Sequence, residues 1–481
     1  MYIAKRGAFV LAVWLLWLGY LALTDTGAFW ISLVLVPIFG AITWSAIRSR
    51  NIVLQAYAVF MFVAHAIGAP FLWLSRSNYG SGFGSVGNFE FDLAEFFLIY
   101  VWVVTLYAAL VWGTRKLDVY IKPKHGNVPK SVQQTHHTPP ALTSRNSARI
   151  YGALLIGFII FIMVPLNVFM AYNNIGTLGL LRDPLPYRLT GILYYTRLYF
   201  GPLLIVLLFS KSNRNWKLVA VILGYAFMAG LGSASRTVLL ISMFPVGYFA
   251  TIDRQQVRLG LVVASGVLGF LLTSGSRDYT FSNETFVFGE AFGVAFSLLL
   301  DGHISVFDAI GGIANRFYGA QDMILAYQYI REDNWTAMAN YFMSGGRANS
   351  VVPDLGRDFF NMNLEGTGFG VGIGTMAYLL ILSHSNILVM PFAILIQSFL
   401  ISAGNKLLMK FLARTVATNL VSHSVARGPL QMVLGGYMGF SLYSSSINNF
   451  YFIAQLLLIA LLLHSLFKNF EAANRQYARK H

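Results

Sequence analysis

Four arginines with distinctive neighbours are the side chains of this sequence best suited to bind an anion. Arg236 ends the segment GLGSASR, and Arg277 ends the segment SGSR. Arg316 opens the segment RFYGAQD, and Arg197 lies inside an apolar run. The forked guanidinium group contacts a phosphate or carboxylate through two parallel hydrogen bonds. These residues therefore indicate a site for an anionic substrate.

Carboxylate and imidazole groups that could accept a proton gather in residues 274–367, which contain eleven of the nineteen Asp and Glu residues. Asp322 follows Arg316 by six residues, and His303 and Glu290 are alternative proton acceptors in the same stretch. A carboxylate or an imidazole can take the proton of an attacking hydroxyl group. The helical spacing of apolar residues here also fits a solvated helix face over a packed one, so both interpretations stay open.

The elements that must position these residues are membrane helices. Hydrophobic residues make up 56% of the 481 residues and charged residues 11%, whereas a soluble domain carries about 25% charged residues. Because lipid offers the backbone no hydrogen-bond partner, continuous apolar runs predict α-helices that satisfy their own backbone groups. The runs lie at 8–24, 29–47, 52–74, 93–113, 150–172, 191–209, 217–232, 237–252, 259–273, 369–383, 386–404, 429–443 and 447–467.

The distribution of basic residues predicts the topology, because Lys and Arg concentrate in loops on the cytoplasmic side. With the N-terminus inside, the basic segments between the early runs all fall inside. The loop 406–427 and the basic C-terminus fall inside only if one later run does not cross, and the glycine-rich run 369–383 is the weakest. We therefore predict an all-α polytopic membrane protein with about twelve transmembrane helices, a re-entrant segment and both ends inside.

This topology divides the chain into six segments. Residues 114–149, with four prolines and scattered lysines, read as a disordered cytoplasmic linker, and residues 274–385 as a large outer loop with helices and the re-entrant segment. Transmembrane helices are expected in the segments 1–113 (helices one to four), 150–273 (five to nine) and 386–467 (ten to twelve), followed by a cytoplasmic tail at 468–481.

The basic residues of the predicted outer side are all arginines. Arg357 is one of them, and it joins the four arginines above as a candidate for the anion site. A generic solvated surface would mix in lysine. Tyr318, beside Arg316, offers a flat face and a hydroxyl group, although aromatic residues also belt the membrane interface for structural reasons. The outer side therefore suits an anion that carries a polar, ring-shaped group.

Several other classes of function fit the sequence poorly. The positive charge follows the loops of the predicted topology, so it does not indicate nucleic acid. The chain has no cysteine, which excludes thiolate metal sites and cysteine nucleophiles. No Asp or Glu lies in the middle of a predicted span, which argues against an ion-coupled transporter.

Three segments resemble the Wzy-type O-antigen and oligosaccharide repeat-unit polymerases of bacteria. They are GSASRTVLL at 232–240, NRFYGAQD at 315–322, and the glycine-rich stretch 366–378 that ends at Tyr378. The resemblance extends over the architecture from about 150 to 467. It implies a protein of the bacterial inner (cytoplasmic) membrane, built like the C-type membrane glycosyltransferases.

The resemblance implies a metal-independent glycosyl transfer without a cofactor. The substrate would be an oligosaccharide linked to undecaprenyl diphosphate, and a chain-length regulator protein would be a partner. The diphosphate leaving group needs fixed cationic donors. In this interpretation the proton acceptor is Asp322, His303 or Glu290, and the diphosphate or sugar contacts come from Arg236, Arg277, Arg316, Arg197, Arg357 and Tyr318.

Two other functions stay open at this point. An O-antigen ligase would use the same lipid-linked donor but transfer the glycan to a lipid core. A flippase or exporter of lipid-linked oligosaccharide would need an arginine-rich cavity reachable from both sides of the membrane. The long acidic outer segment favours the enzyme, because a transporter would not need it.

Overall fold

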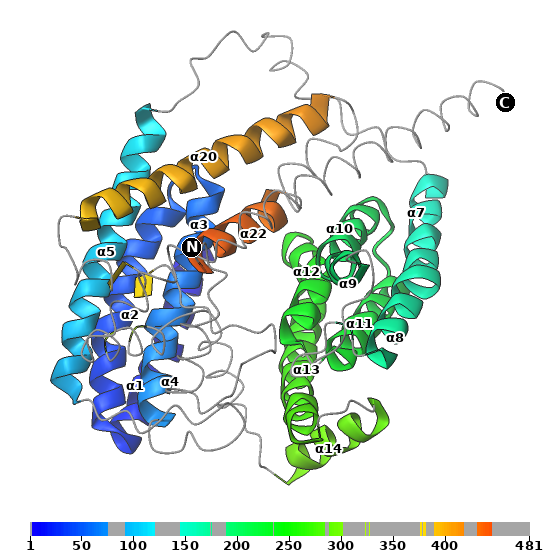
Figure 1. Ribbon diagram of the computed structural model, residues 1–481, viewed down its shortest axis with the longest axis horizontal. Helices are drawn as coiled ribbons and strands as arrows, with labels where there is room; N and C mark the ends of the chain where they lie inside the picture. The colour runs from blue at the N-terminus through cyan, green and yellow to red at the C-terminus, as the bar shows by residue number, and fades with distance from the viewer. Residues whose placement is uncertain are drawn as a thin grey trace. The chain divides into compact units, whose positions relative to one another are not determined.

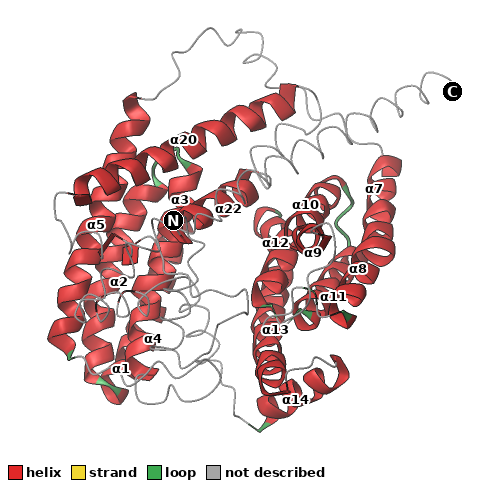
Figure 2. Ribbon diagram, in the orientation of Figure 1, coloured by secondary structure: helices red, strands yellow, loops and turns green. Residues whose placement is uncertain are grey.

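The computed structural model describes most of the apolar regions of the chain as helices (Figure 1). The described residues are 2–75, 92–120, 145–173, 175, 189–233, 235–283, 288–301, 389–417 and 431–444, with the single positions 323, 327, 376, 377, 379 and 380. All regular structure in these residues is helical (Figure 2). The all-α prediction is therefore confirmed for the described part of the chain.

The described helices belong to two compact units. Unit 1 contains the N-terminal helices and most of the last two described helices. Its elements are α1 (Tyr2–Thr24), α2 (Thr26–Ile47), α3 (Ile52–Met61), the π-helix η1 (Phe62–Ile67), α4 (Gly68–Ser75), α5 (Leu93–Tyr120), α20 (Val389–Ala417) and α22 (Gln431–Ser444).

Unit 2 contains the helices between residues 145 and 300, and it holds the described arginines of interest. Its elements are α7 (Arg145–Phe158), η2 (Ile159–Met163), α8 (Val164–Tyr172), α9 (Leu189–Tyr195), η4 (Thr196–Phe200), α10 (Gly201–Lys211), α11 (Trp216–Gly232), α12 (Arg236–Ile252), α13 (Gln256–Asn283) and α14 (Phe288–Leu300). The π-helices η2 and η4 continue directly into α8 and α10, so 145–172 and 189–211 are each one helical run.

Polar residues at the helix starts explain where several helices begin. Asp25 accepts a hydrogen bond from the Ala28 amide at 2.9 Å, and Asn51 accepts one from the Leu54 amide at 2.9 Å. Asn215 caps α11 in the same way through the Leu218 amide at 3.0 Å. Each cap satisfies one of the amide groups that the first helical turn leaves open.

The core of unit 1 is aromatic. Phe39 of α2 stacks on His65 of η1 at 5.8 Å and on Tyr107 of α5 at 5.7 Å. The Tyr107 hydroxyl lies 3.0 Å from the Thr43 hydroxyl. Helix α20 joins the same unit, because its Asn405 side chain accepts a hydrogen bond from the Ile52 amide at 3.2 Å.

Six helical runs are long and apolar enough to cross a membrane within the described residues: Thr26–Ile47, Ile52–Leu74, Leu93–Tyr120, Ala148–Tyr172, Gln256–Thr273 and Met390–Ala413. Shorter apolar helices occur at Leu11–Thr24, Trp216–Gly232 and Val238–Thr251. Large apolar side chains lie exposed along them, including Leu16, Leu23 and Phe161. Such a surface suits lipid rather than water, so the chain is a membrane-embedded helical protein.

Several helices extend beyond the ends that the apolar runs predicted, and two of them, α13 and α20, do so by ten residues or more. Helix α13 continues past residue 273 to Asn283, and α20 continues past residue 404 to Ala417. Both extensions carry charged residues, which end an apolar run without ending a helix. Arg277 therefore lies within a helix rather than in a loop, and Lys406 and Lys410 lie on α20.

Candidate functional site

The turn before Arg236 is fixed by backbone and side-chain hydrogen bonds at one end of unit 2. The Ser235 amide donates to the Gly230 carbonyl at 3.0 Å, and the Ser235 side chain caps α12. The chain therefore reverses from α11 to α12 within a few residues. A Cβ atom at Gly230 would lie 2.8 Å from the Leu239 Cβ atom, so glycine permits the close approach of the two helices.

Helix α13 brings the backbone of Arg277 to the same end of unit 2. The hydroxyl group of Ser276, the preceding residue, donates to the Leu231 carbonyl of α11 at 3.5 Å. Leu231 and Leu272 pack together with Ala295 of α14. The backbones of Arg236 and Arg277 therefore lie at the same end of unit 2.

Helices α8 and α14 also reach this end. A Cβ atom at Gly232 would lie 3.6 Å from the Cβ atom of Ala171 near the end of α8. Glu290 lies in the first turn of α14, with an exposed side chain, and α14 packs against α13. Glu290 is the candidate proton acceptor whose position the structure describes.

Arg197 is buried inside unit 2, with 1% of its surface exposed. It lies on the π-helical segment η4, and π-helical turns occur often at functional sites. Arg197 lies near the hydroxyl group of Tyr225 on α11, and the side chains of Asn167 and Ser242 lie beside the same hydroxyl. We call these four residues the buried polar cluster.

The members of the buried polar cluster come from four helical runs and lie at similar depth. Asn167 precedes Ala171 by four residues, which is about 6 Å along a helix. Tyr225 precedes Gly232 by seven residues, about 10 Å, and Ser242 follows Arg236 by six residues, about 9 Å. Since Ala171 and Gly232 are adjacent, the cluster lies one to two helical turns inside the end where Arg236 and Arg277 meet.

Several polar atoms of the buried polar cluster can still form hydrogen bonds with a ligand. Asn167 Nδ2 donates to the Met163 carbonyl at 2.7 Å. The Asn167 and Ser242 side chains lie close enough to the Tyr225 hydroxyl to interact with it, but no hydrogen bond of good geometry joins Tyr225 Oη, Asn167 Oδ1 or Ser242 Oγ to a described residue. Buried polar atoms without a partner are unfavourable and call for a ligand or water. Two hydroxyl donors and a guanidinium group at one depth suit an anionic oxygen.

The other predicted site residues cannot be placed relative to this end. His303, Arg316, Tyr318, Asp322 and Arg357 lie outside the described residues, so their roles stay predictions. Of the predicted arginines, Arg197 is described with its side chain, and Arg236 and Arg277 through their backbone.

Sequence reasoning did not single out Asn167, Tyr225 or Ser242. Each is a polar residue inside an apolar run, and that signal was visible in the sequence. Their shared depth with Arg197 depends on which helices are neighbours, and apolar runs do not determine this. Within the described residues no group of three His, Asp or Glu side chains gathers as metal ligands would.

Comparison with known protein families, with curated proteins and with solved structures finds no match for this chain.

Proposed function

We propose that this protein is a membrane glycosyltransferase that joins undecaprenyl-diphosphate-linked oligosaccharide repeat units into a surface polysaccharide. The observation that carries the proposal is the buried Arg197 within the buried polar cluster, next to the end of unit 2 where the Arg236 and Arg277 backbones meet. A lipid-linked diphosphate places its charge at the membrane boundary. Arginines at and just inside such a boundary are suitable partners for it.

The proposed reaction transfers the growing glycan from its lipid carrier to one incoming repeat unit. The acceptor hydroxyl oxygen forms a bond with the anomeric carbon of the donor sugar, and the bond to the diphosphate oxygen breaks. Undecaprenyl diphosphate leaves with the bonding electron pair, and arginine side chains stabilise its charge. The acceptor proton passes to a carboxylate or an imidazole of the chain.

Three residues are proposed for the proton transfer: Asp322, His303 and Glu290. Glu290 is exposed on α14, which packs at the end of unit 2 described above. Exposure leaves its carboxylate accessible to an acceptor sugar outside the lipid. Asp322 and His303 are proposed from the sequence alone.

The proposed setting is the bacterial inner membrane, with about twelve spans and both chain ends in the cytoplasm. Arg236, Arg277 and the long acidic segment would then face the periplasm. A chain-length regulator protein is the proposed partner, because a polymerase does not by itself fix the number of units added.

Lipid-linked glycans from a strain that lacks this protein test the proposal. A polymerase deletion leaves single repeat units, both on the carrier and capped on the lipid core. A ligase deletion would instead leave long glycans on the carrier. A flippase deletion would leave single units on the cytoplasmic side. Long glycans on the carrier, or single units on the cytoplasmic side, would contradict the proposal that this protein is a polymerase.

A further inference from the structure

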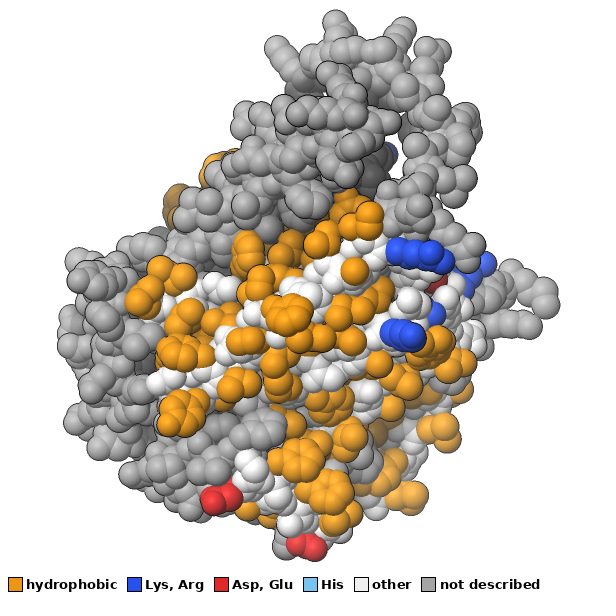
Figure 3. Space-filling view, turned by 90° about the vertical axis from the view of Figure 1, so that its right-hand side faces the viewer, with side chains coloured by type: hydrophobic (Ala, Val, Ile, Leu, Met, Phe, Trp, Pro, Cys, Tyr) orange, Lys and Arg blue, Asp and Glu red, His pale blue; other side chains and the backbone are white. Residues whose placement is uncertain are grey.

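The end of unit 2 opposite to the candidate site carries a compact group of basic residues. The segments 211–217 and 253–258 contain Lys211, Arg214, Lys217, Arg254 and Arg258, and one acid, Asp253. They form the turns from α10 to α11 and from α12 to α13. Figure 3 shows basic side chains gathered at one edge of a broad exposed apolar surface.

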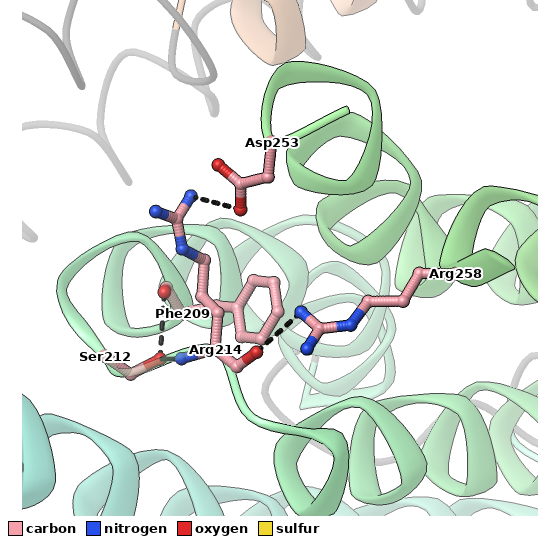
Figure 4. Close-up of polar contacts among 5 residues, drawn as sticks. All are labelled: Phe209, Ser212, Arg214, Asp253 and Arg258. Carbon is pink, nitrogen blue, oxygen red and sulfur yellow. Dashed lines mark hydrogen bonds and ion pairs between the residues drawn. The ribbon is translucent and has the colours of Figure 1, made fainter. Parts of the chain in front are cut away.

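Specific contacts hold the two turns together (Figure 4). Arg214 Nη1 lies 3.2 Å from a carboxylate oxygen of Asp253, and Arg258 Nη1 donates to the Arg214 carbonyl at 2.7 Å. The Arg214 guanidinium also lies over the Phe249 ring, 4.8 Å from its centroid. These three contacts fix the position of the first turn. We call these contacts the turn brace.

Both turns contain an arginine in the left-handed backbone region, with φ of 36° at Arg214 and 53° at Arg254. A residue with a Cβ atom adopts this conformation rarely, and such strain persists only where the surroundings hold it. For Arg214 the turn brace supplies that support. The strained geometry is therefore a built feature of this end of the unit.

Two cations next to the turn brace stay available to a ligand. Lys217 and Arg254 are exposed and make no ion pair or hydrogen bond with a described side chain. They directly follow Trp216 and Asp253 in the sequence. The turn brace therefore satisfies Asp253 and leaves positive charge facing outward.

The residue types at this corner are typical of the headgroup layer of a bilayer. The Arg258 guanidinium lies over the Trp216 ring, 4.7 Å from its centroid, and Trp216 is 49% exposed. Exposed tryptophan is typical of the membrane–water interface. Val257, one residue before Arg258, is 76% exposed, so an apolar side chain adjoins the charges.

We propose that this corner of unit 2 is a binding site for an anionic phospholipid. The phosphate would contact Lys217 and Arg254, and the acyl chains would lie along the apolar surface beside Val257. A zwitterionic lipid offers the same acyl chains but no net negative charge, so the site discriminates by charge. The inference does not depend on the proposed glycosyl transfer.

Native mass spectrometry of the purified full-length protein with added phosphatidylglycerol or phosphatidylcholine tests this proposal. We expect the protein to retain phosphatidylglycerol preferentially, and excess inorganic phosphate not to displace it. Lys217→Gln and Arg254→Gln should each lower the retention about fivefold, the factor that corresponds to about 1 kcal/mol for one basic residue near an anionic membrane surface. Lys217→Arg and Arg254→Lys should keep it.

Asp253→Asn separates a built site from simple charge attraction. This variant increases the positive charge but removes the ion pair of the turn brace, so we expect weaker phosphatidylglycerol retention. Stronger retention would show charge attraction alone and overturn the built site. Wild-type retention in the Lys217→Gln/Arg254→Gln double variant would overturn the site altogether, and displacement by inorganic phosphate would identify a free anion as the ligand.

Discussion

At the scale of single residues, the buried polar cluster is unfavourable for folding but suited to the proposed binding of an anionic substrate. Arg197, Asn167, Tyr225 and Ser242 lie inside apolar helices, where polar groups without partners destabilise the fold. Three of their oxygen atoms complete no direct hydrogen bond with described residues. An anionic ligand oxygen would accept hydrogen bonds from the Tyr225 and Ser242 hydroxyl groups. The hydroxyl groups that weaken the protein alone would therefore strengthen binding of the proposed substrate.

Substitution of Arg197 should affect transfer strongly. Each charge-assisted hydrogen bond contributes about 1.5–3 kcal/mol, which corresponds to about tenfold to 150-fold in rate. Arg197→Ala should therefore shorten or abolish the polysaccharide ladder on a gel. Arg197→Lys keeps the charge but loses the fork, so it should restore little. Full-length glycan from Arg197→Ala, at a normal protein level, would exclude Arg197 from the site.

Tyr225→Phe should separate stability from activity. No hydrogen bond of good geometry joins the Tyr225 hydroxyl to a described residue, although Asn167 and Ser242 lie beside it. Its removal should therefore leave the thermal unfolding temperature unchanged or raise it. Transfer should nevertheless slow, because the substrate loses a hydroxyl partner. A lowered unfolding temperature in detergent would instead assign the hydroxyl a structural role.

The proton acceptor can be tested by three single substitutions: Asp322→Asn, His303→Ala and Glu290→Gln. We expect Asp322→Asn or His303→Ala to abolish polymerisation while the protein still inserts into the membrane. Normal polymerisation in both variants would move the role to Glu290. Chain-length distributions on a gel, with protein levels checked by immunoblotting, give the answer.

At the scale of elements, close helix contacts place the two boundary arginines together. Leu239 of α12 fits between Gly230 of α11 and Gly269 of α13, since a Cβ atom at either glycine would come within 2.8 Å of the Leu239 side chain. These contacts bring the ends of α11, α12 and α13 to one place. Packing at small residues is a common way for membrane helices to approach.

Gly230→Ala should disturb this packing. The added methyl group would meet the Leu239 Cβ and Cα atoms, which cannot move without the backbone, and overpacking of this kind costs about 1–3 kcal/mol. Gly224→Ala is the matched control on the same helix, because nothing lies within 4 Å of its Cβ position. Thermal unfolding in detergent should show a loss for Gly230→Ala alone. Equal unfolding temperatures would contradict the close contact.

The helices themselves were largely predictable, whereas their ends and neighbours were not. Apolar length predicted the helices at 52–74, 150–172 and 217–232 closely. Apolar length did not predict the extensions of α13 and α20. Charged residues end an apolar run, but the helix continues through them beyond the membrane core. The cluster around Arg197 was missed because its members are distant in sequence and meet only through tertiary packing.

At the scale of the whole molecule, charge should orient the helices in the membrane. The turns that contain Arg214 and Arg254 lie at the end of unit 2 opposite to Arg236 and Arg277. The positive-inside tendency places such basic turns in the cytoplasm. The candidate site would then open to the periplasm, where repeat units are joined in the proposed reaction.

Reporter fusions at residue 415 test this orientation. We expect a reporter that is active only in the periplasm to be inactive there, because residue 415 lies near the end of α20, within the basic segment 406–427. The control is a fusion within residues 274–367, which should be active. Periplasmic activity at residue 415 would refute the twelve-span topology.

Reconstitution of the purified protein in liposomes tests the central claim most directly. The substrate is the undecaprenyl-diphosphate-linked repeat unit isolated from the deletion strain, and the products are separated by glycan length. The proposed function predicts glycans of two or more units, with one undecaprenyl diphosphate released for each unit joined, and little of either product with Arg197→Ala. Unchanged single units, with carrier retained throughout, would contradict the assignment of this chain as a polymerase.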